Sequence, residues 1–235
     1  MMGAMDDKTA AVVNALADAT NRLVRTVDSM TDEQYAEPSL LPGWTRAHVV
    51  AHLALNAEGL GGAVHGLNIG EPAPMYESNE ARDADIEEVA ALSPTKLRER
   101  LLSGAGLFTD AIAHLSEDGW QDEIERVPGG MHFTVASIPA RRRTEVEVHH
   151  ADLGLAYTSA DWPGDFCAAF IQVMSARLEE HGDGFTVVAT DLNRSWDVAG
   201  GGTEIRGTAG DLGWWLSGRG GEDRLTGELP EIGEW

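Results

Sequence analysis

The sequence predicts an N-terminal bundle of four long helices followed by a small C-terminal domain of mixed α/β structure. Two observations on the 235 residues support this fold class. As far as Tyr157, long segments carry apolar residues at helical spacing, which gives each helix one face to bury. Beyond a stretch typical of a linker, residues 159–165, glycine becomes dense and short strand-like segments follow. We therefore expect two domains, residues 1–160 and 161–235.

The first long helix is indicated by an apolar stripe that extends to about residue 30. Its members stand three or four positions apart, as on one face of a helix. They are Val13, Leu16, Thr20, Leu23, Val27 and Met30. Directly afterwards, Thr31 and Gln34 have the spacing of a capping box, which predicts a short turn of helix.

The next three helices each begin after a side chain that can cap a first turn. These starts are Thr45 before a long helix over 46–66, Ser78 before a shorter helix over 79–86, and Ser93, followed by Pro94, before the third long helix. The capping residues therefore set the helix starts where the apolar pattern alone is ambiguous.

The fourth long helix is expected over 138–157, although the alternation of residues 145–148 also fits a strand. No Gly or Pro interrupts residues 140–153. In a helix, Glu145 and His149 would be about 5–6 Å apart between Cβ atoms and could share one metal ion. In a strand, at about 3.3 Å per residue, they would be roughly 13 Å apart and could not. We therefore favour the helix.

His52, on the second long helix, would complete a metal site of two histidines and one carboxylate. The expected ligands are His52, Glu145 and His149. Bundle cores commonly hold metals on side chains from facing helices. Three protein ligands leave at least one coordination position open, which is typical of a catalytic or ligand-binding metal rather than a structural one. The sequence therefore predicts an enzyme.

The C-terminal domain is expected to begin with a helix over 163–181. Three short strands follow, at 185–190, 195–199 and 203–207. Thr208 is then a suitable N-cap for a last helix, with Asp211 at its N3 position. No phosphate-binding glycine loop stands between a strand and a helix, so the pattern does not predict a nucleotide site.

The formal net charge of -22 argues against a nucleic-acid partner, because a protein that binds phosphates needs a basic surface. An anionic substrate would be repelled in general, so a metal and one or two arginines must reverse the potential locally. The single cysteine, Cys167, excludes an internal disulfide, and we expect a small buried side chain rather than a nucleophile. With no signal peptide and no apolar run of membrane length, we expect a cytoplasmic protein without a membrane partner.

Several stretches resemble the mycothiol-dependent maleylpyruvate isomerases, and the resemblance runs nearly from end to end. They are Leu40 to His52, Met75 to Arg82, Glu145 to Gly154, and the tail around Gly218-Arg219-Gly220. The resemblance implies a DinB-like four-helix bundle that binds a divalent metal, usually zinc, and a small C-terminal α/β domain. The family's metal ligands match His52, Glu145 and His149. An arginine important for its activity, and expected to contact the cofactor, matches Arg219.

The activity implied by the resemblance is the cis-to-trans isomerisation of maleylpyruvate to fumarylpyruvate in gentisate degradation, with mycothiol as cofactor. A thiolate adds to the double bond, the resulting single bond rotates, and the thiolate leaves. A metal would hold the thiol as thiolate by lowering its pKa; alternatively it could polarise the substrate carbonyl. We favour the first role. Arg82 or Arg219 would then offset the negative charge of the enolate. For the oligomeric state, we expect a monomer.

Some alternatives stay open at this stage. His48, one turn before His52, could also chelate the metal, and Asp152 could fix the tautomer of a ligating histidine. The basic run 141–143 is either the solvated start of a helix or a contact for cofactor carboxylates. The same bundle could also serve a mycothiol S-transferase that acts on another electrophile, or a non-enzymatic metal- or thiol-binding module.

Overall fold

The computed structural model describes residues 7–179 and 184–232 and divides into two compact units, Met1–Gly154 and Leu155–Trp235. The first unit is almost entirely helical. The second combines helices with a three-stranded sheet. The fold class expected from the sequence is therefore confirmed, and each unit is described by itself.

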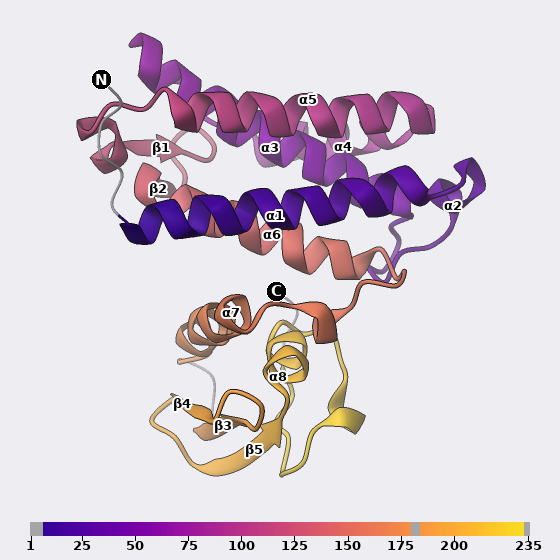
Figure 1. The fold of residues 1–235 in the computed structure, drawn as a ribbon, viewed down its shortest axis with the longest axis vertical. Coiled ribbons are helices and arrows are strands. Elements are labelled where there is room, and N and C mark those ends of the chain that lie inside the picture. Colours follow the sequence, from indigo (N-terminus) through magenta and orange to yellow (C-terminus); the bar gives the residue numbers. More distant parts are fainter. Residues whose placement is uncertain (1–6, 180–183, 233–235) are drawn as a thin grey trace. The chain divides into compact units, whose positions relative to one another are not determined.

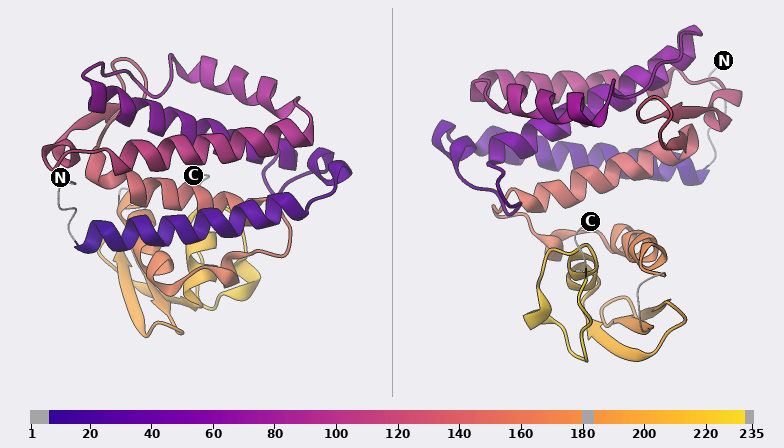
Figure 2. Two further views of the ribbon diagram at one scale, coloured as in Figure 1. Left: turned by 45° about the horizontal axis from the view of Figure 1, so that its top comes forward. Right: turned by 180° about the vertical axis from the view of Figure 1, so that it is seen from behind.

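The first unit is built on four long helices (Figure 1). They are α1 (Asp7–Ser29), α3 (Arg46–Ile69), α5 (Pro94–Ala113) and α6 (Ile138–Asp152). Helix α3 packs against both α5 and α6, and α1 packs against α6. A further helix, α4 (Asn79–Ala90), lies beside α3 (Figure 2). Much of α3 is buried, as expected of a helix that is apolar on most of its faces.

The capping predictions explain where most of these helices begin. Thr31 and Gln34 form a capping box at the start of α2 (Asp32–Ala36). At α3, Thr45 forms a second box in which His48 takes the N3 position. At α4, the Ser78 hydroxyl accepts a hydrogen bond from the backbone N–H of Ala81 at 3.0 Å. Each box satisfies backbone donors that would otherwise lack partners in a first helical turn.

The predicted helix ends were less accurate than the starts. Helix α6 ends at Asp152, so the expectation that it reaches residue 157 was wrong. The chain turns at Gly154, whose φ of 64° lies in the left-handed region that favours glycine. Helix α3 continues past residue 66 to Ile69 and closes on Gly70, which also has a positive φ. Helix α4 likewise continues past residue 86 to Ala90.

The first unit contains a small hairpin that was not predicted from the sequence. Strands β1 (Glu123–Glu125) and β2 (His132–Thr134) pair antiparallel, with Ile124 opposite Phe133. Two backbone hydrogen bonds join the segment around Tyr76 to β1 and the residue after it. Met75 N–H donates to Glu125 O at 2.9 Å, and Tyr76 N–H donates to Arg126 O at 3.1 Å. The hairpin therefore positions a loop that no helical pattern specifies.

The second unit packs two helices against each other and against a small sheet. Its elements are α7 (Gly164–Arg177), β3 (Phe185–Ala189), β4 (Arg194–Val198), β5 (Thr203–Gly207) and α8 (Ala209–Leu216). Strand β3 is central, antiparallel to β4 and parallel to β5. All three predicted strands are present: β3 and β5 lie within their predicted ranges, and β4 begins one residue before its range, at Arg194. The Thr208 hydroxyl accepts from Asp211 N–H at 3.2 Å as expected.

Two expectations for the second unit need adjustment. Helix α7 ends at Arg177 rather than at residue 181, which lies outside the described residues. The stretch expected as a linker contains a short 3-10 helix, Ser159–Asp161, whose first turn is capped by Thr158. Cys167 is buried, as expected of a small apolar side chain.

Candidate metal centre

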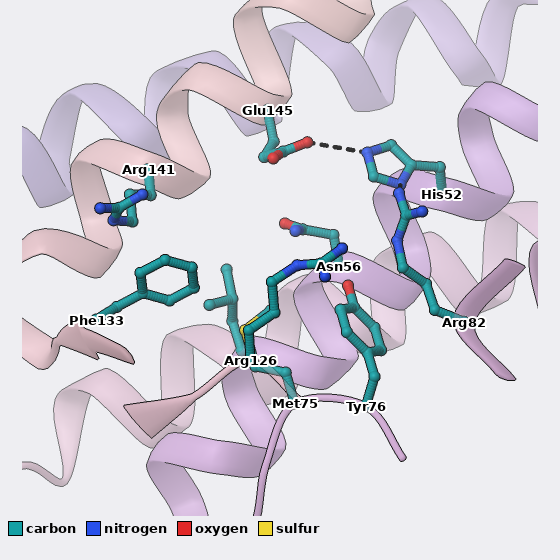
Figure 3. Close-up of a pocket in the computed structure, with 10 residues that line it drawn as sticks. His52, Asn56, Met75, Tyr76, Arg82, Arg126, Phe133, Arg141 and Glu145 are labelled. Atoms are coloured by element: carbon teal, nitrogen blue, oxygen red, sulfur yellow. Dashed lines mark hydrogen bonds and ion pairs between the residues drawn. The ribbon is translucent and has the colours of Figure 1, made fainter. Parts of the chain in front are cut away.

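The three predicted ligands converge between two helices of the bundle. His52 comes from α3, whereas Glu145 and His149 come from α6, one turn apart. Glu145 Oε2 lies 2.9 Å from His52 Nε2 and 3.3 Å from His149 Nε2. One ligand atom from each residue lies within 4.8 Å of the other two, and this is the only group of metal-binding side chains found in the described residues. Figure 3 shows the His52–Glu145 contact at the top of a pocket.

The protonation of the cluster follows from burial and from its internal hydrogen bonds. Burial lowers the pKa of His52 to about 4, so this imidazole is neutral at neutral pH. Burial alone would raise the pKa of Glu145, but hydrogen bonds from both histidines outweigh it and bring that pKa well below its usual value. Burial likewise opposes the charged form of His149, yet Asp152 and Glu145 outweigh it and raise the pKa of His149.

Asp152 fixes the orientation of His149. The carboxylate Oδ2 lies 2.8 Å from His149 Nδ1, and Asp152 has no exposed surface. A carboxylate in this position orients the ring and makes the opposite nitrogen a better ligand. His149 therefore presents Nε2 to the cluster, and the role that the sequence left open for Asp152 has a geometric basis.

The neighbouring histidines lie in other networks. His48 Nδ1 lies 2.7 Å from the Thr45 hydroxyl and forms the capping box of α3, and its Nε2 lies 3.3 Å from Glu87. His150 Nε2 lies 2.7 Å from Thr26 Oγ1 on α1. Neither belongs to the convergent group of three.

Arg82 contacts the outer nitrogen of His52. Its Nη2 lies 3.2 Å from His52 Nδ1, while its Nη1 donates to Asp83 at 2.7 Å. A guanidinium has only donors, so Nδ1 must accept and the proton of the neutral ring must lie on Nε2. A metal on Nε2 requires the opposite tautomer. Metal binding at His52 and the Arg82 contact therefore exclude one another.

A pocket opens beside the cluster and is rich in positive charge (Figure 3). Ten residues line it: His52, Asn56, Leu60, Met75, Tyr76, Arg82, Arg126, Phe133, Arg141 and Glu145. Three arginines thus face the pocket with a single carboxylate, although the chain has 39 acidic and only 17 basic residues. Such a local reversal of the net charge favours a small anionic ligand.

Two of these arginines are held against aromatic rings. The Cζ of Arg141 lies 4.1 Å from the centroid of Phe133, and that of Arg126 lies 5.7 Å from the centroid of Tyr76. Neither forms an ion pair within residues 7–179 or 184–232. From the sequence, Arg141 stood out only as part of a basic run. Arg126 and Tyr76 were not predicted as site residues, because the hairpin that places them was not predicted.

Arg219 belongs to the second unit, where it follows α8 between two glycines with positive φ, Gly218 and Gly220. Its Cζ lies 5.7 Å from the centroid of the Trp214 ring, and its Nη1 donates to Ser217 O at 3.4 Å. Its expected part in catalysis and cofactor binding stays a prediction.

Comparison with known proteins identifies the family. The model of the mycothiol maleylpyruvate isomerase N-terminal domain matches residues 16–154, which is more than half of the chain. The chain belongs to this family. The matched range includes all three residues of the cluster and every residue that lines the pocket.

Solved structures extend the likeness over nearly the whole chain. A crystal structure of the mycothiol-dependent maleylpyruvate isomerase is 27% identical and covers 97% of each chain, with a TM-score of 0.88. A crystal structure of a histidine-to-alanine mutant of that enzyme gives the same identity and coverage, with a TM-score of 0.87. A search of curated proteins finds no match. The resemblance seen in the sequence is thereby confirmed, together with the fold class.

A membrane span is not found in the described part of the chain, where no helix is both long and apolar enough to form one.

Proposed function

We propose that this protein is a mycothiol-dependent maleylpyruvate isomerase that converts maleylpyruvate to fumarylpyruvate. Family membership and a solved isomerase that matches over 97% of both chains support the proposal. The observation that carries it is the convergence of His52, Glu145 and His149 beside a pocket lined by three arginines. This arrangement suits a reaction in which a thiolate attacks a small dianionic alkene.

The cluster has the donor set of a divalent metal site, and we propose Zn²⁺ as its ion. Two imidazole nitrogens and one carboxylate oxygen are ligands that zinc commonly uses, and three protein ligands leave a position for a thiol. Asp152 already orients His149 as such a site requires. The positive charge of a bound metal would lower the pKa of the mycothiol thiol and hold it as thiolate near neutral pH.

The arginines of the pocket have complementary tasks. The substrate carries two carboxylates, and Arg126 and Arg141 face the pocket without an ion pair in the described chain. They are available to bind those carboxylates, which an acidic protein would otherwise repel. Arg82 stands closest to the cluster, at His52 Nδ1. We propose that Arg82 or, as the family resemblance implies, Arg219 offsets the negative charge that develops on the enolate.

The decisive experiment supplies the purified protein, with its native metal, with maleylpyruvate and a small amount of mycothiol. Formation of the trans product is followed by its absorbance, and free thiol is measured in parallel. An isomerase turns over many substrate molecules without consuming thiol. Stoichiometric loss of thiol would instead indicate an S-transferase. Binding of metal and mycothiol without any turnover would indicate a non-enzymatic module.

Two variants locate the activity in the cluster. His52→Ala should abolish turnover, whereas Arg25→Gln, at an exposed position of α1, should leave it unchanged. The role of the metal is tested separately on the cobalt-substituted protein. A sulfur-to-metal charge-transfer band that appears on adding mycothiol supports thiolate generation, and its absence would favour polarisation of the substrate carbonyl.

A further inference from the structure

Tyr76 brings the one phenolic hydroxyl into the pocket. It lies in the loop between α3 and α4, and its hydroxyl end points into the space below Glu145 (Figure 3). A loop residue can serve as a catalytic group only if its side chain is held in place. The first question is therefore what fixes the ring.

Three contacts fix the ring of Tyr76. Its backbone N–H donates to Arg126 O at 3.1 Å, which ties the loop to the chain just after β1. The guanidinium of Arg126 lies over the ring at 5.7 Å from its centroid. On α3, a Cβ at Gly59 would stand 3.2 Å from Tyr76 Cε1 and 3.1 Å from Met75 O, tighter than most real Cβ contacts. The absence of a side chain at Gly59 thus lets the loop approach the helix closely.

A buried amide beside the hydroxyl has a fixed orientation. Arg142, only 2% exposed, donates from Nη1 to Asn56 Oδ1 at 2.7 Å. Because a guanidinium cannot accept a hydrogen bond, the Asn56 atom that faces it must be the oxygen. The amide nitrogen of Asn56 therefore turns to the other side, where the residue lines the pocket beside Tyr76.

The Tyr76 hydroxyl is consequently a neutral donor without an assigned acceptor. Burial raises the pKa of Tyr76, and the nearby Arg82 and the Asn56 amide offset that effect only in part. The hydroxyl thus keeps its proton at neutral pH. No hydrogen bond of its O–H is found in residues 7–179 or 184–232, in contrast to Tyr35, whose hydroxyl donates to Val27 O at 2.9 Å.

We propose that Tyr76 is a further catalytic residue, which donates a hydrogen bond to the substrate carbonyl oxygen that is conjugated with the double bond. The assignment rests on the proposed isomerase reaction. When the mycothiol sulfur forms a bond to the alkene carbon, the π electrons move to that carbonyl and leave a negative charge on its oxygen. A prepositioned donor stabilises this charge more than it stabilises the neutral ketone.

The step needs no net proton transfer. After rotation about the new single bond, the enolate electrons re-form the double bond and the carbon–sulfur bond breaks. The thiolate is released as it entered, and Tyr76 keeps its proton throughout. Asn56, held by Arg142, acts as a positioning residue that faces the phenolic oxygen with a donor and leaves the phenolic O–H to face the substrate.

The test is Tyr76→Phe, which removes one oxygen and leaves the ring and its contacts. Loss of a single donor to a developing oxyanion typically lowers kcat about 10²–10³-fold. We therefore expect kcat to fall by about a hundredfold, with KM and bound metal little changed. Tyr35→Phe is the matched control, since it removes a buried tyrosine hydroxyl that does not line the pocket, and it should leave kcat unchanged. A Tyr76→Phe enzyme with wild-type kcat, or with only KM raised, would overturn the assignment.

A binding measurement keeps this assignment separate from the proposed function. Acetylpyruvate has the same 1,3-diketo acid end as the substrate but no alkene, and calorimetry at mildly alkaline pH measures the affinity of its enolate without turnover. We expect Tyr76→Phe to bind it about tenfold more weakly than the wild type, as for loss of one hydrogen bond to a charged group. Equal affinities would refute the role of Tyr76 even in a protein without isomerase activity. If the protein shows no turnover but the two proteins differ tenfold in affinity for acetylpyruvate, only the proposed reaction is refuted.

Discussion

Helix α6 carries a glutamate and a histidine on each of two sides, and the two sides differ in the residues that contact them. On one side, Glu145 and His149 meet His52 from α3 and border the pocket. On another, Glu147 has no exposed surface and pairs with Arg22 of α1 at 2.8 Å and with Arg143 at 3.7 Å. There His150 lies 2.7 Å from Thr26 of α1. Both groups of side chains lie within the bundle.

The comparison shows that a buried acidic residue does not by itself mark a functional site. Glu147 faces two guanidinium groups, which only donate and cannot bind a metal, so its charge is neutralised within the fold. Glu145 instead faces two imidazoles, which can release a proton and coordinate a metal. The first network fastens α6 to α1, and the second has the composition of a metal site.

The largest expected effect is the loss of metal binding in Glu145→Gln. The neutral amide is a poor ligand, so zinc affinity should fall by more than the about 10–100-fold typical for loss of an outer-shell partner. A titration against a chelator of known affinity measures it. Glu147→Gln is the matched control on the same helix and should bind zinc as the wild type does. Equal losses in the two variants would mean that the two faces of α6 are not independent.

The same two variants should show the opposite order in a stability measurement, with the larger loss in Glu147→Gln. Removing one partner of a buried ion pair typically costs about 3–5 kcal/mol, because the remaining charge is left buried. We expect Glu147→Gln to lower the free energy of unfolding by about 3 kcal/mol, measured by urea denaturation of the metal-free protein. Glu145→Gln should lower it by less, since the imidazole partners of Glu145 can release a proton and need not leave a buried charge behind. A Glu147→Gln protein of wild-type stability would contradict the structural role of this network.

Asp152→Asn should have an intermediate effect on the metal side of the helix. The amide keeps the shape of the carboxylate but loses its charge, so it holds His149 Nδ1–H less firmly. Loss of such a partner typically reduces metal affinity about 10–100-fold. Zinc titration should place this variant between the wild type and Glu145→Gln. An unchanged affinity would show that packing alone orients His149.

Features of the fold and the site could be predicted from the sequence where they depend on residues close together in the chain. The helix starts followed from local capping residues such as Thr45 and Ser78. The convergence of His52, Glu145 and His149 was accessible because helical spacing places the last two on one face. His52 stood on another bundle helix, and the family resemblance selected it rather than His48 as the third ligand. The end of α6 was missed because it depends on a turn at Gly154 rather than on the periodicity of the helix.

The rest of the pocket was not accessible because long-range pairing places it. Strands β1 and β2 have three residues each, too few to show an alternating pattern. Without that hairpin, nothing in the sequence indicates that Arg126 and Tyr76 meet, since their contact depends on backbone hydrogen bonds across 50 positions. The clearest signal available was chemical: the chain has 17 basic residues against 39 acidic ones, so a basic residue without a nearby acid is a candidate for local function.

The smallest expected effect is a change in zinc affinity when Arg82 is replaced, and whether the affinity rises or falls is informative. Because Arg82 donates to His52 Nδ1, it stabilises the tautomer that cannot bind a metal through Nε2. A typical hydrogen bond contributes about 1 kcal/mol, so Arg82→Gln should raise zinc affinity by about fivefold, although it should lower kcat. Arg126→Gln removes the same charge from the same pocket without touching His52, and it should change zinc affinity less. If zinc affinity rises equally in both variants, the cause is the loss of a positive charge from the pocket and not the contact with His52. If Arg82→Gln loses affinity, the competition between Arg82 and the metal for His52 does not exist.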